Sequence, residues 1–429
     1  MPRSSRIPGF YQLPPDERLR HVKEFASLTD EEAEIIRSGG LDLATASRMI
    51  ENVVGKFPLP LGIAVNFLVN GRDYLVPMVI EEPSVVAAAS NAAKMARDGG
   101  GIHSFQGDQL MIGQVQLVNV PNPYAAKMEI LRNKEEILAA ANERDPVLVN
   151  LGGGAKDLEA RVIETELGKM LITHLIVDVK DAMGANAVNT MCEAVAPMLA
   201  RLTGGSFRLR IISNLADRRI VRAYARIPAE SVGGVDVAKG IVEAYHFAKA
   251  DPYRAATHNK GIMNGIDAVV IATGNDWRAV EAGAHAYAAR NGRYEPLSVW
   301  EQLPNGDLHG SIELPLAVGI VGGATRTNPL AKLCLKILGV KTAKELAEVI
   351  AAVGLVQNLA ALRALAAEGI QAGHMSLHAK NIAVMAGAVG EEIDMVAEAM
   401  VREKTVRVDR AQEILAELRS RRRQQFQNT

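Results

Sequence analysis

Apolar side chains along the chain alternate between the period of a helix and that of a strand. From 260 to 273 they recur at helical spacing, and we expect this helix at the centre of the fold. Residues 63–79 are predicted to form two strands joined at Asn70-Gly71, a dipeptide typical of a hairpin. The same patterns predict helices at 83–98, 123–143, from 187 and from 342 toward 369, and strands at 109–121, 158–165, 169–180, 206–213, 219–227 and 311–324.

The predicted elements group into four stretches of chain. Between 109 and 215 strands alternate with helices, as in a small α/β domain inserted between two halves of a larger one. We therefore expect an α+β fold with a large domain around the central helix (1–108 and 216–370). A small dinucleotide-binding domain (109–215) and a C-terminal helical flap (371–429) complete the prediction.

Composition excludes several classes of protein. The net charge of −1 gives no broad attraction to nucleic acid or to a membrane surface. Cys192 and Cys334 lie in apolar helical stretches, where free thiols fit a reducing cytosol. No uninterrupted apolar run reaches the roughly 18 residues of a membrane span, and the first residues lack the apolar core of a signal peptide. We expect a cytoplasmic protein with no membrane or nucleic-acid partner.

The central helix carries a polar stripe on one side. Lys260, Asn264 and Asp267 follow each other at intervals of four and three, so they share one face. A solvated face is the ordinary explanation of such a stripe. Arg254 just upstream, two glycines in the helix and its otherwise apolar character favour instead a site for an anionic or carbonyl-bearing small molecule.

Two other segments suggest chemistry. The run 181–186, Asp-Ala-Met-Gly-Ala-Asn, lies between a strand and a helix, where free amides and a glycine attract a pyrophosphate. It lacks the GxGxxG fingerprint and is a weak signal alone. Glu82 comes at the predicted start of a helix, where the dipole favours an anion, although a surface glutamate has the same pattern.

Seven segments taken together resemble a known family. They occur in this order: Ile50-Glu51-Asn52-Val53-Val54-Gly55, Glu82-Pro83-Ser84, Asp181-Ala182-Met183-Gly184-Ala185-Asn186, Asn259-Lys260-Gly261-Ile262-Met263-Asn264-Gly265, Gly274-Asn275-Asp276, Val321-Gly322-Gly323-Ala324-Thr325 and Gly373-His374-Met375. The ordered set is similar to the 3-hydroxy-3-methylglutaryl-coenzyme A (HMG-CoA) reductases, from about residue 40 to the C-terminal segment. Glu-Pro-Ser and the expected lack of an anchor resemble the soluble bacterial class II enzymes.

The resemblance implies a reaction and its catalytic residues. HMG-CoA and mevalonate plus coenzyme A would be interconverted by two hydride transfers with a nicotinamide. Lys260 would stabilise the oxygen that becomes negative, and Glu82 would donate a proton to the aldehyde oxygen. Asp276 is expected to hydrogen-bond both and couple their protonation, and His374 would protonate the thiolate of coenzyme A.

The resemblance also implies the binding residues. Arg254 would bind the substrate carboxylate, with help from Ser84, Asn264, Asn214 and Gln357. An acid at Asp145 would accept the ribose hydroxyls and repel a 2′-phosphate, which favours NAD, with NADP possible. Further cofactor contacts are expected at Asp181, Met183, Gly184, Asn186, Gly322 and Gly323.

Three expectations and two alternatives remain. His374 and His378 have a spacing seen in zinc sites, but no third ligand follows, so we expect no metal. A flap after Gly369 and Gly373 would close over the site while coenzymes exchange, and a homodimer or an assembly of dimers is implied. The alternatives are a related acyl-CoA oxidoreductase and a non-catalytic acyl-CoA-binding protein; Lys260→Ala distinguishes the second, because a binder keeps its ligand.

Overall fold

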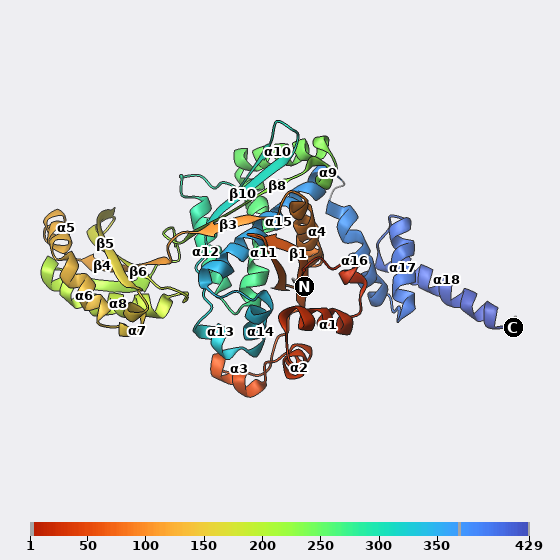
Figure 1. The fold of residues 1–429 in the computed structure, drawn as a ribbon, viewed down its shortest axis with the longest axis horizontal. Coiled ribbons are helices and arrows are strands. Elements are labelled where there is room, and N and C mark those ends of the chain that lie inside the picture. The colour runs from red at the N-terminus through yellow and green to blue at the C-terminus, as the bar shows by residue number, and fades with distance from the viewer. Residues whose placement is uncertain (1–3, 368–369, 428–429) are drawn as a thin grey trace.

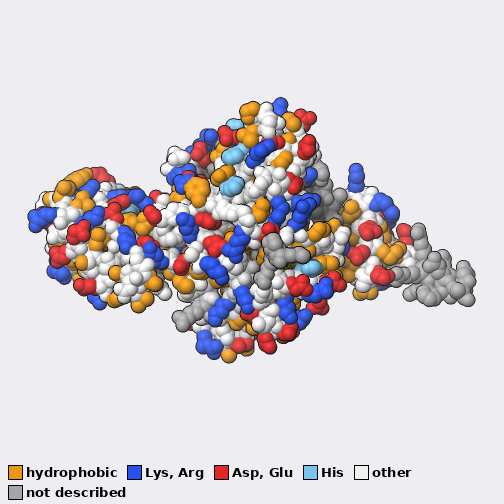
Figure 2. Space-filling view, viewed as in Figure 1, with side chains coloured by type: hydrophobic (Ala, Val, Ile, Leu, Met, Phe, Trp, Pro, Cys, Tyr) orange, Lys and Arg blue, Asp and Glu red, His pale blue; other side chains and the backbone are white. Residues whose placement is uncertain are grey.

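The computed structural model describes residues 4–367 and 370–427, without the side chains of 324, 326, 370–377 and 421–427. Three parts lie side by side in Figure 1: a small lobe that contains β4–β6, a central body that contains α11 and α15, and helices α16–α18 at the C-terminal end. Side chains of both charges are interspersed over the face seen in Figure 2, as the near-neutral net charge leads one to expect.

The small lobe is one antiparallel sheet with helices packed on it. Its strands run in the order β5-β6-β4-β7. Buried side chains of β4, β6 and α8 form a separate apolar core. The strands are β4 (Leu110–Val118), β5 (Gly154–Thr165), β6 (Gly168–Asp178) and β7 (Ser206–Ile212), and the helices are α5 (Pro123–Arg132), α6 (Lys134–Asn142), α7 (Pro146–Asn150) and α8 (Ala185–Thr203).

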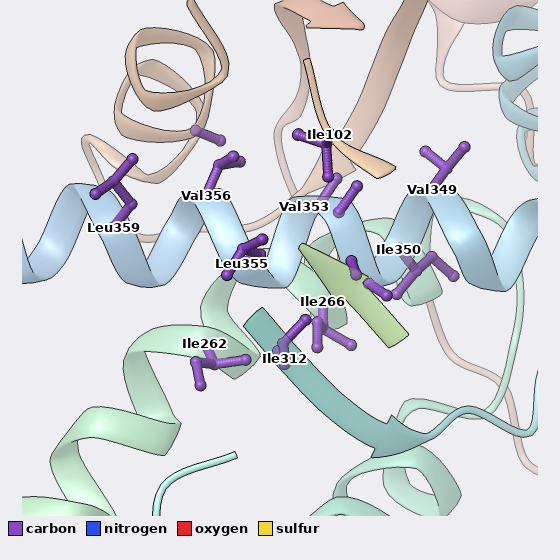
Figure 3. Packing of buried hydrophobic residues seen from close by; sticks show 14 of the residues in the cluster. Ile102, Ile262, Ile266, Ile312, Val349, Ile350, Val353, Leu355, Val356 and Leu359 are labelled. Carbon is purple, nitrogen blue, oxygen red and sulfur yellow. The ribbon is translucent and has the colours of Figure 1, made fainter. Parts of the chain in front are cut away.

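The central body packs helices on a hairpin and a four-stranded sheet. Helices α11 (Pro252–Ala272) and α15 (Ala343–Ala367) share its largest apolar core. Figure 3 shows α15 between Ile102 on one side and Ile262, Ile266 and Ile312 on the other. The hairpin is β1 (Leu61–Val69) with β2 (Arg72–Val79), and the sheet has the order β3-β8-β10-β9, with β3 (His103–Gln106), β8 (Ile220–Ile227), β10 (Leu308–Pro315) and β9 (Ser298–Gln302).

The remaining helices lie around the central body or form a separate unit at the C-terminal end. Around the body lie η1 (Phe10–Gln12), α1 (Pro15–Ala26), α2 (Asp30–Ser38), α3 (Leu43–Met49), α4 (Val85–Asp98), α9 (Ala229–Val232), α10 (Val235–Ala250), α12 (Trp277–Ala288), α13 (Gly323–Thr327) and α14 (Pro329–Leu338). The unit at the end, α16 (Ile370–Met385), α17 (Glu391–Arg402) and α18 (Val408–Gln427), has an apolar core of its own.

Helix α15 is the only described helix that is long and apolar enough to cross a membrane, by length and composition alone. Of its most apolar window, 67% is buried inside the protein. Its apolar character is therefore explained by its place in the core. The predicted start at Thr342 is confirmed, since the Thr342 hydroxyl accepts from Glu345 N at 3.1 Å.

The mixed helix–sheet class and the hairpin at Asn70-Gly71 are confirmed. Several element predictions are wrong in extent, among them the strand expected at 158–165, which begins at Gly154, and the strand expected at 109–121, which ends at Val118. The central helix begins eight residues earlier than 260, because Asp251 caps it and Pro252 occupies its first position. The helix expected at 83–98 begins at Val85, the one at 123–143 is two helices that meet at Asn133, and the strand expected at 311–324 ends at Pro315.

The two sheets are joined through one buried arginine. Arg219 is completely buried between the small lobe and the body. Its guanidinium donates to Gln109 Oε1 at 2.8 Å, to the carbonyls of Ala182 and Met183 at 3.1 and 3.2 Å, and to that of Val318 at 2.6 Å. Burial lowers the pKa of Arg219 to about 10, so the group is charged at neutral pH. The division of the chain at 108 and 215 falls in this connecting region and stays a prediction.

Candidate active site

The polar stripe of α11 emerges from a buried helix. Ile262, Met263 and Ile266 are buried on its apolar face. The side chain of Lys260 is 59% exposed on the opposite face, and Asn264 lies one turn further, partly exposed. A rigid core helix therefore presents an ammonium group and a carboxamide to the same open space.

Glu82 meets this stripe from a segment 178 residues earlier in the chain. Its Oε2 lies 2.7 Å from Lys260 Nζ, and its Oε1 accepts from Asn264 Nδ2 at 3.4 Å. Glu82 belongs to the connection between β2 and α4, not to the first turn of α4, so the predicted dipole effect does not apply. Ser84 follows as the N-cap residue with φ +73°, a left-handed conformation that is strained for serine and often marks a functional segment. Its hydroxyl does not cap α4, which leaves it for other partners.

Asp276 has a different partner from the one expected. Its Oδ1 accepts from the amides of Arg278 and Ala279, both at 3.1 Å, and so caps α12. Its carboxylate also lies 3.2 Å from the Arg278 guanidinium. Among the described contacts of Asp276, the predicted hydrogen bonds to Lys260 and Glu82 are replaced by these.

The predicted substrate residues are distributed around α11. Arg254 lies in its first turn, partly buried, and burial lowers the pKa of its guanidinium. Six residues separate it from Lys260, a rotation of roughly 120° around the helix, so the two cations face different directions. Gln357 of α15 is buried beside Gly265, where an added Cβ would lie 2.9 Å from the Gln357 Cβ. Its Oε1 has no hydrogen-bond partner among the described residues. Exposed Asn214 follows β7, and its carbonyl lies against α12.

The two segments predicted to bind the cofactor lie side by side. Ala182 forms a β-bridge with Val321, and the amide of Ile320 donates to the carbonyl of Asp181 at 2.9 Å. Gly319 permits this approach, because an added Cβ would lie 2.5 Å from the amide nitrogen of Met183. The structure thereby brings Met183 and Gly184 close to Gly322 and Gly323, which are exposed.

A nicotinamide dinucleotide fits this arrangement. Gly184, at φ +101°, is the N-cap of α8, and no side chain caps that terminus. The free amides there suit a pyrophosphate, and Asn186 is exposed in the first turn. The carboxylate of Asp181 is used differently: its Oδ1 accepts from the amide of Ala343 at 2.8 Å, at the start of α15.

Asp145 caps a short helix of the small lobe. Its Oδ1 accepts from the amide of Leu148 at 2.9 Å, and the residue is partly exposed. The hydrogen bonds described for Asp145 use Oδ1 alone, which leaves Oδ2 as the atom able to accept from a ribose hydroxyl.

His374 lies in the backbone of α16, and its side chain is outside the described part of the structure. The same helix contains Gly373, which is therefore helical rather than a break before a flap, and Gly369 is not among the described residues. His378 is exposed on this helix.

Two polar residues of α11, buried His258 and partly buried Asp267, have no role predicted from the sequence. The Nε2 atom of His258 lies 2.7 Å from Ser298 Oγ, and burial lowers the pKa of His258 to about 3, so it is neutral. Asp267, on the Lys260 stripe, is hydrogen-bonded to Glu281 of α12, and burial raises its pKa to about 9. The stripe includes Asp267, but its partner is visible only in the fold.

A groove of about 1250 Å³ lies next to the Glu82–Ser84 segment. The N-terminal segment, β1 and α4 form its walls, and Val86 and Ala87 of α4 line it just after Ser84. Arg6, Lys94 and Lys380 add positive charge, the last of them from α16.

Comparison with known proteins agrees with the motifs. The family profile described as hydroxymethylglutaryl-coenzyme A reductase matches residues 14–379. The chain is 64% identical over 417 residues to 3-hydroxy-3-methylglutaryl-coenzyme A reductase of Archaeoglobus fulgidus, covering 97% of this chain and 95% of that protein. It is 37% identical over 347 residues to a probable enzyme of the same name from Borreliella burgdorferi, covering 78% and 77%.

The fold is similar to solved structures as well. The class II 3-hydroxy-3-methylglutaryl-CoA reductase of Streptococcus pneumoniae, solved bound to NADPH in open conformations, superposes with a TM-score of 0.81 at 44% identity. The match covers 95% of this chain and all of that one. The chain is therefore an oxidoreductase and belongs to the hydroxymethylglutaryl-coenzyme A reductase family.

Proposed function

We propose that the protein interconverts HMG-CoA and mevalonate plus coenzyme A, with NAD(H) as the preferred coenzyme. The observation that carries the proposal is the cluster of Lys260, Asn264 and Glu82, which joins an exposed cation to a carboxylate within 2.7 Å. Such a pair supplies both a positive charge and a proton-transfer group to one carbonyl oxygen.

Lys260 stabilises the negative charge that develops on that oxygen. A fixed ammonium group beside the reacting carbonyl favours the transition state more than the ground state. Glu82 donates a proton to the aldehyde oxygen and must be protonated at that step.

Asp276 and His374 complete the proposed catalytic set. Asp276 is held by the first amides of α12, and we propose that its Oδ2 faces the Lys260–Glu82 pair when substrate is bound. His374 protonates the thiolate of coenzyme A from α16.

In this proposal, different groups of residues bind the substrate and the nicotinamide coenzyme. Arg254, Ser84, Asn214 and Gln357 bind the acyl group, and the unpaired Gln357 Oε1 suits its hydroxyl. NAD(H) supplies or accepts the hydride when bound. The amides after Gly184 hold its pyrophosphate.

We place coenzyme A in the groove beside α4. Val86 and Ala87, just after Ser84, line it together with Arg6, Lys94 and Lys380, and these cations suit the phosphates. Because Lys380 belongs to α16, the helix that carries His374 also contributes to this groove.

A homodimer is part of the proposal. The segment from Ile50 to Leu59 exposes large apolar side chains, with Val54 99% and Phe57 90% exposed. Such an exposed apolar arm fits burial against a second copy of the chain. We also propose that the protein acts in the cytoplasm.

The test follows nicotinamide absorbance in purified protein given mevalonate and coenzyme A, with NAD+ and NADP+ in parallel. We expect reduction that requires both substrates and is faster with NAD+. A reaction without coenzyme A, or faster with NADP+, would contradict the corresponding part. If neither NAD+ nor NADP+ is reduced, and if HMG-CoA is not reduced in the reverse assay either, the protein is not a reductase and the acyl-CoA-binding alternative remains. Light scattering of the same sample should give the mass of a dimer or a multiple of it.

A further inference from the structure

Asp267 and Glu281 form a carboxyl pair between two helices of the site. Asp267 belongs to α11, three residues after Asn264, and Glu281 belongs to the second turn of α12. The two side chains are hydrogen-bonded, which requires a proton because neither carboxylate can donate.

The environment decides which member carries the proton. Asp267 is partly buried, and its Oδ1 is buried and accepts from no donor of the described residues, so a negative charge on that oxygen has no hydrogen-bond partner. Glu281 Oε2 lies 2.5 Å from His285 Nε2, whereas His285 Nδ1 lies 2.7 Å from the Tyr294 hydroxyl. The hydrogen bond from His285 lowers the pKa of Glu281, and burial together with Glu281 raises that of Asp267 to about 9. The unpaired Asp267 Oδ1 and the contact of Glu281 with His285 therefore both favour the proton on Asp267.

No other charge in the described part of the chain acts on the two carboxyl groups. From α12 they are faced by His285, and through it by Tyr294 of the segment before β9. Helix α15 contacts Gly265 of α11, two residues before Asp267, with Val353 and Gln357, and neither of these ionises.

The pair connects the helix that carries Lys260 with the helix that begins after Asp276. Helix α11 carries Lys260, and α12 begins directly after Asp276, five residues before Glu281. Helix α12 also fits closely on Asn214, whose carbonyl would lie 2.6 Å from a Cβ at Gly283. A hydrogen bond from α11 to Glu281 therefore fixes the helix that presents Asp276 and supports Asn214.

We propose that Asp267 and Glu281 are positioning residues that share one proton, and that this protonated pair holds α12 against α11 so that Asp276 is correctly placed relative to Lys260. The link to catalysis rests on the proposed role of Asp276. The existence of the shared proton does not depend on that role, and it can be measured even in a protein without activity.

The sign of the pH effect follows from the raised pKa. Between its ordinary value of 3.8 and about 9, Asp267 is protonated in the folded protein and ionised in the unfolded chain. The stabilisation is complete below 3.8 and is lost as the pH rises toward about 9. For this group the unfolding equilibrium constant increases up to tenfold per pH unit in that range.

The first test is spectroscopic and thermal. The infrared difference between wild type and Asp267→Asn at pH 7 should contain the carbonyl band of one protonated carboxyl group, which disappears as the pH passes about 9. Asparagine keeps a donor for Glu281 but cannot ionise. The melting temperature of wild type should therefore fall relative to that of Asp267→Asn as the pH rises. The absence of both the band and this divergence would overturn the shared proton. Asp236→Asn, which removes an exposed carboxylate on α10, is the control for lost charge.

The second test measures positioning. Asp267→Ala should lower kcat tenfold or more with little change in KM, and Asp267→Asn should restore kcat at pH 7. An unchanged kcat in Asp267→Ala would overturn the positioning role, as would failure of asparagine to restore it while the infrared band is present. If wild type itself is inactive, the proposed function fails and the infrared test still decides the proton.

Discussion

Lys260 and Arg219 are two cations in parts of the molecule that use charge differently. Lys260 is 59% exposed and pairs with one carboxylate, Glu82. Arg219 is completely buried between the small lobe and the body, and donates to three backbone carbonyls and one carboxamide. The first arrangement leaves N–H donors for a ligand, and the second uses the donors of the fork to join two sheets. The comparison teaches that burial and the type of partner, rather than charge alone, separate a cation that is available to a ligand from a structural one.

Replacing Lys260 should produce the largest effect. Lys260→Ala removes the positive charge that we propose beside the reacting oxygen, and loss of one such group typically lowers kcat by about 10²–10³-fold. Stability should hardly change, because an exposed ion pair contributes only about 0–1 kcal/mol. Steady-state rates and melting temperatures of the same samples measure the two effects.

The matched control is Lys239→Ala. Lys239 also pairs with one carboxylate, Glu243, and its side chain is 68% exposed, but it lies on α10 away from the proposed set. Its rate should equal that of wild type. If Lys260→Ala lost stability rather than rate, Lys260 would belong with Arg219 as a structural cation.

Replacing Arg219 should invert the pattern. Arg219→Lys keeps the charge but loses the planar fork, so buried carbonyls of Ala182, Met183 or Val318 lose their donor. We expect a loss of about 1.5–3 kcal/mol in the free energy of unfolding, the usual range for a hydrogen bond to a charged group.

Because Arg219 bonds the turn before α8, the KM for the nicotinamide should also rise, with a smaller change in kcat. Arg218→Lys is the control, since Arg218 is half exposed and pairs with Glu159. Equal unfolding free energies for the two variants would show that the buried fork is not what joins the sheets.

The sequence predicts local structure and the Lys260 stripe for the same physical reason. Spacing along a helix fixes which side chains share a face, so Lys260 and Asn264 are recognisable from the chain alone. Asn70-Gly71 and Thr342 likewise act on their immediate neighbours. The strand ending at Pro315 and the break at Asn133 depend on packing, and the apolar pattern continues across both.

Partners distant in sequence are not encoded in any local pattern. Glu82 reaches Lys260 across 178 residues, and only the ordered family motifs connect them in the sequence. Arg219 and Glu281 belong to no motif, and their roles depend on burial against other elements. Three predicted acids also accept from backbone amides, Asp145 and Asp276 from nearby residues and Asp181 from Ala343, 162 residues away; sequence motifs do not distinguish this function from ligand binding.

Replacing Asp145 should produce the smallest and most specific effect. The same carboxylate can cap α7 through Oδ1 and bind the adenosine ribose through Oδ2. Asp145→Asn keeps a side-chain oxygen for the amide of Leu148, since asparagine caps helices as well as aspartate does. Only the negative charge is lost. If Oδ2 faces the adenosine ribose, a 2′-phosphate is no longer repelled, and the ratio of kcat/KM for NAD to that for NADP should fall about tenfold, equivalent to about 1.4 kcal/mol. Glu143→Gln, which neutralises an exposed acid two residues away, should leave the ratio unchanged. A ratio that is the same in all three proteins would make Asp145 a structural cap, and coenzyme choice would then depend on other residues around the α8 turn.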